Sequence, residues 1–129
     1  MAKSKLPRPT DAELEILKVL WDCGPSTVRQ VHDVLTRGKA VAHNTVLTFL
    51  QIMTDKGLVL RDTSVRPQVY QAALPEKRTQ RQLLEDLLDR AFDGSVQKLV
   101  AAMVGRKVSE RERTAIRDLL DHLDQEEKL

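Results

Sequence analysis

The chain has 129 residues, of which 41% are hydrophobic and 3% aromatic, enough for about one domain, or a small domain plus an oligomerisation element, with an aliphatic core. A single cysteine, Cys23, excludes an internal disulfide and any metal site built from several cysteines. The net charge is only +2, and no apolar run approaches the roughly 20 residues that span a bilayer, so we expect a soluble, cytoplasmic protein without membrane insertion.

The first predicted element is a helix over 11–21, which follows a flexible arm over 1–9. Thr10 can act as its N-cap, and Glu13 stands three residues later, at the spacing of a capping box. Leucines recur on one face of this helix. The sequence CGPS ends it, because glycine can adopt a positive φ and proline cannot continue a helix.

Two more helices are predicted before the pattern changes. The second begins after Ser26 or Thr27, either of which can serve as its N-cap, and it ends near Gly38. The third covers about 43–56 and ends where a lysine precedes Gly57, which is the usual pattern of a helix C-terminus.

The segments LVLRDTSV (58–65) and QVYQAAL (68–74) are short and contain many β-branched residues, which predicts a hairpin with its turn near Thr63–Pro67. Three helices followed by such a hairpin make a winged helix-turn-helix. We therefore expect a mostly α fold with a small β-hairpin, in which residues 10–74 form a winged-helix DNA-binding domain.

From Pro75 the chain is predicted to be helical again, over about 77–92, around Val96–Met103, and from Ser109 onward. These helices carry apolar stripes but are too few and too short to make a separate monomeric core. We therefore predict that residues 75–129 form a helical dimerisation domain that completes its burial against a second copy. The predicted dimerisation residues are Leu83, Leu84, Leu87, Leu88, Phe92, Leu99, Met103, Ile116, Leu119, Leu120 and Leu123.

No pattern of an enzyme or a metal site is present. His32, His43 and His122 match no short metal or triad motif, and no glycine-rich phosphate loop occurs. Aspartate and glutamate residues are spread along the predicted helix faces, and we interpret them as solvated surface charges, not as catalytic groups. We expect Cys23 to be a partly buried structural thiol. The sequence therefore predicts no catalysis, no metal and no cofactor.

The third helix has two unlike faces. One face is predicted to be buried and carries Val46, Phe49, Leu50 and Met53. The opposite face carries Asn44, Leu47, Thr48, Gln51 and Asp55. A solvent-facing surface usually collects lysine, glutamate and arginine, whereas this one has little charge, so something other than water is expected to meet it.

The floor of the DNA major groove has the chemistry that this face would match. Amide side chains can pair bidentately with adenine, and a threonine or leucine can pack on a thymine methyl group. The N-terminus of the helix offers free N–H groups to a phosphate, and basic residues in the hairpin can lie along the backbone. The predicted DNA-binding residues are Asn44, Thr45, Leu47, Thr48 and Gln51, with Arg61 and Arg66 in the wing.

The charge distribution permits this function without demonstrating it. Residues 1–74 contain 10 basic and 7 acidic residues, whereas residues 75–129 contain 11 and 12. The first part is therefore mildly basic and the second is nearly neutral, and a dimer would double the basic charge.

The stretches LEILKVLWDCGPSTVRQV and HNTVLTFLQIMTDKGLV, the hairpin sequence VYQA and the leucine-rich tail together resemble the BlaI/MecI family of penicillinase repressors, which includes the copper-responsive CopY repressors. The resemblance runs from about Thr10 to Leu123 and is strongest over 14–59. It implies a homodimeric winged-helix repressor on palindromic double-stranded DNA operators, with Asn44, Thr45 and the other positions named above facing the DNA.

The same resemblance implies how the repressor is released. In antibiotic-responsive members, a membrane sensor-protease pathway leads to cleavage within the dimerisation domain, which here falls near Ala102–Met103 in LVAAMV. The asparagine–phenylalanine pair of the family is absent at this place, so another sensor, or none, is compatible with the chain. The copper branch depends on a cysteine-rich tail, and DHLDQEEKL contains no cysteine.

A protein-interaction module is the alternative from another class. Leu47 and Ile52 would then face a partner protein instead of DNA. The two functions differ in salt response, because DNA binding that depends on phosphate contacts weakens steeply as salt rises and apolar docking does not.

Overall fold

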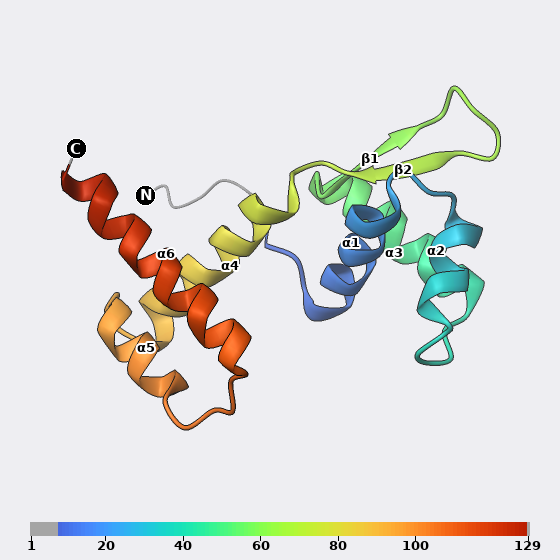
Figure 1. The fold of residues 1–129 in the computed structure, drawn as a ribbon. Coiled ribbons are helices and arrows are strands. Elements are labelled where there is room, and N and C mark those ends of the chain that lie inside the picture. The colour runs from blue at the N-terminus through green and yellow to red at the C-terminus, as the bar shows by residue number, and fades with distance from the viewer. Residues whose placement is uncertain (1–7, 129) are drawn as a thin grey trace. The chain divides into compact units, whose positions relative to one another are not determined.

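A computed structural model describes residues 8–128, with side chains through residue 125. The chain divides into two compact units, one ending at Leu87 and the other beginning at Leu88. The elements, in order, are α1 (Asp11–Cys23), α2 (Val28–Leu35), α3 (His43–Lys56), β1 (Val59–Asp62), β2 (Val69–Ala72), α4 (Glu76–Ala91), α5 (Val96–Met103) and α6 (Glu110–Lys128) (Figure 1). This confirms the predicted mostly α fold with a small hairpin.

Capping boxes begin the first two helices. The Thr10 hydroxyl accepts from the amide of Glu13, whose carboxylate accepts from the amide of Thr10, and Thr27 and Gln30 make the same pair of bonds at α2. Thr27 is therefore the N-cap of α2, which the sequence alone did not distinguish from Ser26. Most of the predicted arm (1–7) lies outside the described residues.

One prediction about α1 is wrong. The helix continues to its C-cap Gly24, so Cys23 occupies its last position, and the thiol is exposed instead of partly buried. The side of the helix that meets the core holds Ile16, Leu17 and Leu20, whereas Cys23, in the last turn, is exposed.

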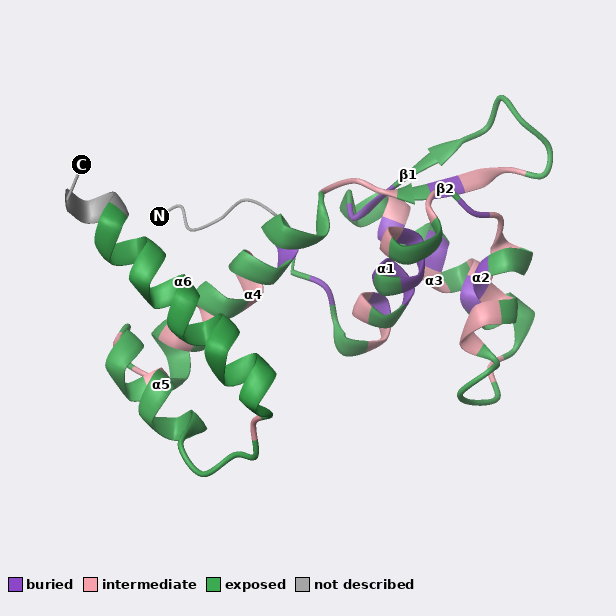
Figure 2. Ribbon diagram, in the orientation of Figure 1, coloured by how far each residue is buried: buried purple, intermediate pink, exposed green. Residues whose placement is uncertain are grey.

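The core of the first unit lies where α1, α2, α3 and the hairpin meet (Figure 2). Its side chains are almost all aliphatic, as the low aromatic content required, with one buried tyrosine among them. The buried hydrophobic residues are Ile16, Leu17, Val19, Leu20, Val31, Val46, Leu50, Met53, Leu58, Val59 and Tyr70. This packing fixes α3 on one side and leaves its other side facing outward.

The hairpin is antiparallel, with Val59 opposite Ala72 and Asp62 opposite Val69. Its strands have four residues each, shorter than the predicted 58–65 and 68–74. The Asp62 carboxylate accepts from the amide of Ser64 at 2.9 Å, a local turn that ends the first strand before the polar connection.

Two backbone hydrogen bonds join the hairpin to the chain just before α2. The amide of Ser26 donates to the Tyr70 carbonyl at 2.9 Å, and the amide of Tyr70 donates to the Ser26 carbonyl at 2.8 Å. Both residues are buried, so the bonds satisfy groups that water does not reach. The segment that leads into α2 is therefore fixed to the wing.

The beginning of α4 is attached to the first unit by its own contacts. The Trp21 indole donates to the Leu74 carbonyl at 2.9 Å, and Thr79 is buried. The Arg8 guanidinium donates to the Asp86 carboxylate at 2.8 Å. The helix that leaves the hairpin thus starts from a fixed point on α1.

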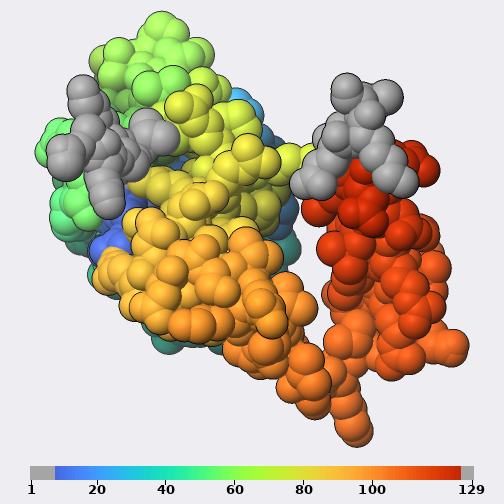
Figure 3. All heavy atoms as spheres, turned by 90° about the vertical axis from the view of Figure 1, so that its left-hand side faces the viewer, coloured from blue at the N-terminus to red at the C-terminus, as the bar shows by residue number. Residues whose placement is uncertain are grey.

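The second unit buries little of its apolar surface. Among their described side chains, α5 and α6 contain no buried residue, and α6 is exposed along its length (Figure 2). The space-filling view shows atoms of α6, in orange-red to red, at the surface on the face that it draws (Figure 3). No helix within 8–128 combines the length and apolar character needed to cross a membrane.

Candidate nucleic-acid interface

Helix α3 has one buried side and one open side. Val46, Leu50 and Met53 are each no more than 1% exposed and anchor the helix in the core. Asn44, Thr48 and Gln51 are exposed, and their spacing of four and three residues places them in one line along the helix. We call these three residues the outer face of α3.

Two predicted contact residues flank the outer face. Thr45 is exposed beside it, and Leu47 is half-buried at its edge, so the leucine offers less surface than expected. Asp55, in the last turn, is exposed on the same side and brings a carboxylate to it. The short polar side chains therefore dominate the N-terminal two-thirds of this surface.

A shallow groove of about 290 Å³ lies along the helix beside the outer face. It is lined by Asn44, Thr45, Thr48, Phe49 and Ile52, and the Ile52 side chain is 43% exposed. Ile52 was predicted only as a residue for a protein partner. Its position one turn after Thr48 could have identified it, because both lie on the same stretch of helix surface.

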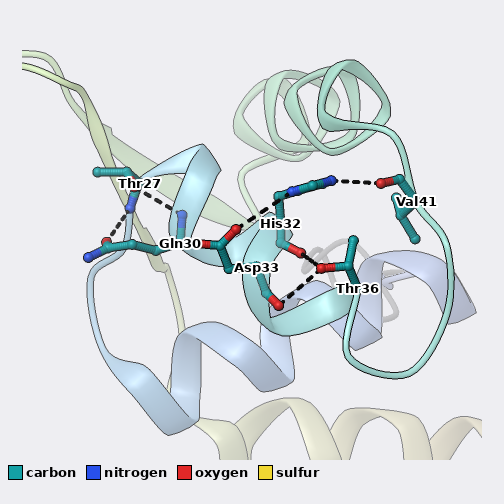
Figure 4. A network of polar contacts seen from close by, with 6 residues as sticks. All are labelled: Thr27, Gln30, His32, Asp33, Thr36 and Val41. Atoms are coloured by element: carbon teal, nitrogen blue, oxygen red, sulfur yellow. Dashed lines mark hydrogen bonds and ion pairs between the residues drawn. The ribbon is translucent and has the colours of Figure 1, made fainter.

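The turn between α2 and α3 holds the N-terminal end of α3 in place (Figure 4). The His32 Nε2 atom lies 2.7 Å from the Val41 carbonyl oxygen. The Thr36 hydroxyl donates to the carbonyls of His32 at 2.9 Å and Asp33 at 3.1 Å, which satisfies the end of α2. Sequence patterns did not identify His32, because its partner is nine residues away in an irregular segment.

The other end of α3 is fixed by a glycine and an ion pair. Gly57 adopts the left-handed conformation with φ of 83°, as predicted for the end of this helix. The Lys56 ammonium donates to the Glu13 carboxylate at 2.8 Å, so its charge is engaged within the fold. Both ends of α3 are therefore held by side chains from other helices.

The wing presents both of its predicted arginines to solvent. Arg61 lies in β1 opposite Tyr70, and Arg66 lies in the connection between the strands. Hydrogen bonds from the hydroxyl and the amide of Ser64 lower the pKa of Asp62. That carboxylate stays charged at neutral pH and is directed to its own turn.

The predicted dimerisation residues are open to solvent to different degrees. Leu83, Leu88, Phe92 and Leu99 are half-buried. Leu84, Leu87, Met103, Ile116, Leu119, Leu120 and Leu123 are exposed. Ala102 and Met103, where the resemblance placed cleavage, form the exposed end of α5.

Within the described part of the chain, histidine, cysteine, aspartate and glutamate side chains do not gather in a group of three or more suited to a metal ion.

Known proteins are similar to this chain in sequence. A family model described as penicillinase repressor matches residues 9–122. The transcriptional regulator BlaI of Mycobacterium tuberculosis is 31% identical over 122 residues, which covers 94% of this chain and 88% of that protein. The penicillinase repressor of Bacillus licheniformis is 26% identical over 96 residues, covering 74% and 75% of the two chains.

A solved structure is similar in fold as well as in sequence. It is the solution structure of the monomeric form of Bacillus licheniformis BlaI in complex with the blaP half-operator. It has a TM-score of 0.50 and 29% identity, and the match covers 57% of this chain and 89% of that one. Because the family match extends from residue 9 to residue 122 and the 31% identity to a known regulator covers 94% of the chain, the protein belongs to the penicillinase repressor family.

Proposed function

We propose that the protein is a transcriptional repressor that binds palindromic operator DNA as a homodimer. The observation that carries this proposal is the outer face of α3, which is exposed and polar yet bears almost no charge. The core holds the opposite side of the helix, so this face is free to meet another molecule. The half-operator complex of the related BlaI supports DNA as that molecule.

The outer face has the donors and acceptors that base edges require. Asn44 and Gln51 can each make two hydrogen bonds to an adenine, and Thr48 can donate, accept or pack its methyl group. Leu47, at the edge, can contact a thymine methyl group, and Thr45 lies near the first free amides of the helix, where a phosphate is favoured. A good bidentate pair contributes roughly 1–3 kcal/mol of discrimination between bases.

The wing arginines have a different role. Arg61 and Arg66 are exposed in the hairpin that follows α3. Contacts from these arginines to phosphates would increase affinity for every DNA sequence alike. The helix would thus determine which bases are bound, and the wing would determine how strongly DNA is bound and how sensitive binding is to salt.

Dimerisation is inferred from the apolar surface of the C-terminal helices. Seven of the predicted residues there are exposed in the single chain, among them Leu87 and Leu119 at 49% and 66%. Apolar side chains in such number would be buried if two copies packed together. Tethering two recognition helices makes the second DNA contact intramolecular, which strengthens binding without any new contact to DNA.

Release of DNA would follow from loss of the dimer. Cleavage near Ala102–Met103, driven by a membrane sensor-protease pathway, would separate α6 from the rest of the chain. The exposed end of α5 supports access of a protease to this segment. The remaining winged-helix domains would then bind half-operators singly and weakly.

The test is selection of bound duplexes from a random pool, followed by affinity measurements on the selected palindrome. The Asn44→Ala variant is expected to lose preference at one base position in each half-site, with a loss of about 1–3 kcal/mol per half-site. The matched Arg66→Ala variant is expected to weaken binding to all duplexes and to lower the salt slope by about one.

The same measurement separates this function from a protein-interaction module. Affinity for the palindrome should fall steeply with salt, with log K decreasing by about 0.9 per phosphate contact for each decade. Failure to enrich any DNA sequence, together with salt-independent capture of a protein through Leu47 and Ile52, would overturn the proposal.

A further inference from the structure

We infer that His32 is a positioning residue, which sets the N-terminal turn of α3 and through it the base preference of the outer face. This inference rests on the proposed DNA-binding function. His32 belongs to α2 and has no place in the predicted contact surface. Its side chain is 25% exposed, so most of it lies inside the turn between the two helices.

The main contact of His32 is with the chain just before α3. Its Nε2 atom is 2.7 Å from the Val41 carbonyl oxygen, a short hydrogen bond in which the ring must donate because the carbonyl can only accept (Figure 4). Nε2 therefore carries the proton in the neutral ring, and it also carries one in the charged ring. The bond is retained in both protonation states.

The second contact is with the first residue of α3. The rings of His32 and His43 are 5.7 Å apart between centroids and inclined by 60°. This distance and tilt are within the range of favourable aromatic packing. His32 thus contacts the chain on both sides of Ala42, the N-cap of the helix.

Helix α3 has particular need of this support. Its N-cap is Ala42, which makes no side-chain hydrogen bond, whereas α1 and α2 each begin with a threonine capping box. A side-chain cap contributes about 1 kcal/mol to holding a helix start. Without one, the bond from His32 to Val41 fixes the start of α3 from the preceding helix.

The consequence for DNA binding follows from the sequence of the helix. Asn44 is the second residue of α3 and lies directly after His43. Hydrogen bonds to base edges require heavy-atom distances of roughly 2.7–3.2 Å, so a small displacement of the first turn removes them. Gln51 lies two turns further on, where Leu50 and Met53 hold the helix in the core.

The test compares three variants of the full-length protein by their affinity for a duplex palindrome selected with the wild type and for an unrelated duplex. His32→Phe keeps an aromatic ring and removes the donor, whereas His32→Gln restores a donor at a similar distance from the backbone. Gln30→Ala is the matched control. It removes a hydrogen bond at the other end of α2, in which the Gln30 side chain accepts from the Thr27 amide at 2.8 Å.

We expect His32→Phe to weaken binding to the palindrome by roughly three- to tenfold per half-site. Its preference should become broader at the base that Asn44→Ala affects and should stay unchanged at the base that Gln51→Ala affects. Affinity for the unrelated duplex should remain within about twofold, because phosphate contacts are not altered. His32→Gln should recover most of the loss.

Amide hydrogen exchange without DNA supplies a readout that does not depend on the proposed function. The amides of Thr45 and Val46, which donate to Ala42, should exchange faster in His32→Phe, whereas that of Leu58, which donates to Met53, should not. Unchanged exchange at Thr45 and Val46, or an equal broadening of base preference in Gln30→Ala, overturns the role of His32. A wild type without any base preference overturns the proposed function instead.

Discussion

Glu13 is a buried carboxylate that joins the beginning of α1 to the end of α3. It is only 2% exposed, and it accepts from the Thr10 amide at 2.9 Å and from the Lys56 ammonium at 2.8 Å. Burial raises the pKa of Glu13, but hydrogen bonds from Lys56 and Thr10 and the charge of Lys56 together bring the pKa below its ordinary value. One side chain thus serves as a cap and as a tertiary contact.

This arrangement predicts a stability that depends on pH. Because the pKa is lower in the folded state, ionised Glu13 stabilises the protein above the unfolded pKa of about 4.3, and this part is lost as pH falls through the folded pKa. Glu13→Gln should lower the free energy of unfolding by about 1.5 kcal/mol at pH 7, measured by urea unfolding. The difference from wild type should shrink below about pH 4.3.

Glu15→Gln is the control for that prediction. The Glu15 carboxylate lies 2.7 Å from the Lys39 ammonium, but both side chains are about half exposed, at 47% and 54%. Solvent screens such a pair, so its removal should change the free energy of unfolding by less than about 0.5 kcal/mol. Equal losses in the two variants would show that burial of Glu13 does not strengthen its contacts.

At the scale of helices and strands, the sequence predicted what local chemistry determines. The capping-box spacing of Thr10 and Glu13 located the start of α1, and Lys56-Gly57 located the end of α3, both as observed. The outer face of α3 was also predictable, because a period of 3.6 residues separates Val46 and Leu50 from Asn44 and Thr48.

The contacts that join elements were not predictable in the same way. His32 with Val41, Glu13 with Lys56 and Trp21 with Leu74 depend on how helices and turns meet in space. No periodic pattern relates residues that are brought together by the tertiary fold. The strand ends were overestimated for a related reason, since the β-branched residues Thr63 and Val65 continue past the last ladder pair of β1 into the turn.

Helix α2 shows how strongly a short element depends on its cap. It has eight residues, fewer than the roughly 12–15 that an isolated helix needs to be stable in water. Its N-terminus is held by reciprocal bonds of 2.8 Å and 3.1 Å between Thr27 and Gln30. These bonds compensate for the small number of residues that α2 places in the core.

Thr27→Ala is therefore expected to lower the free energy of unfolding of the first unit by about 1 kcal/mol. Thr27→Ser keeps the hydroxyl acceptor and should lose no more than a few tenths of that amount. The melting temperatures of both variants, followed by circular dichroism, measure the difference. Equal destabilisation by serine and alanine would contradict the capping role, because only alanine removes the oxygen.

For the molecule as a whole, the two units differ in how well they satisfy their own apolar residues. The first has a contiguous core, whereas the second leaves leucines exposed along α6, including Leu119 at 66% and Leu120 and Leu123 at 57% each. Exposed apolar surface is unfavourable in water, at roughly 25 cal/mol per Å². The periodicity predicted which leucines share a face, but only the structure reveals that a single chain does not cover them.

Charges introduced at exposed leucines of α4 and α6 should prevent the proposed dimerisation and leave the core of the first unit intact. We expect Leu87→Asp combined with Leu119→Asp to give monomers in sedimentation experiments, because a buried unpaired carboxylate at each site opposes association. Palindrome binding should then fall by about 100-fold or more, the gain that tethering supplies, while binding to a half-site is kept.

Gln80→Asp combined with Gln125→Asp is the control. It adds the same charge at exposed polar positions of α4 and α6, and this variant should remain dimeric. Monomers of the leucine variant that still bind the palindrome as tightly as wild type would refute the proposed dependence of DNA binding on dimerisation.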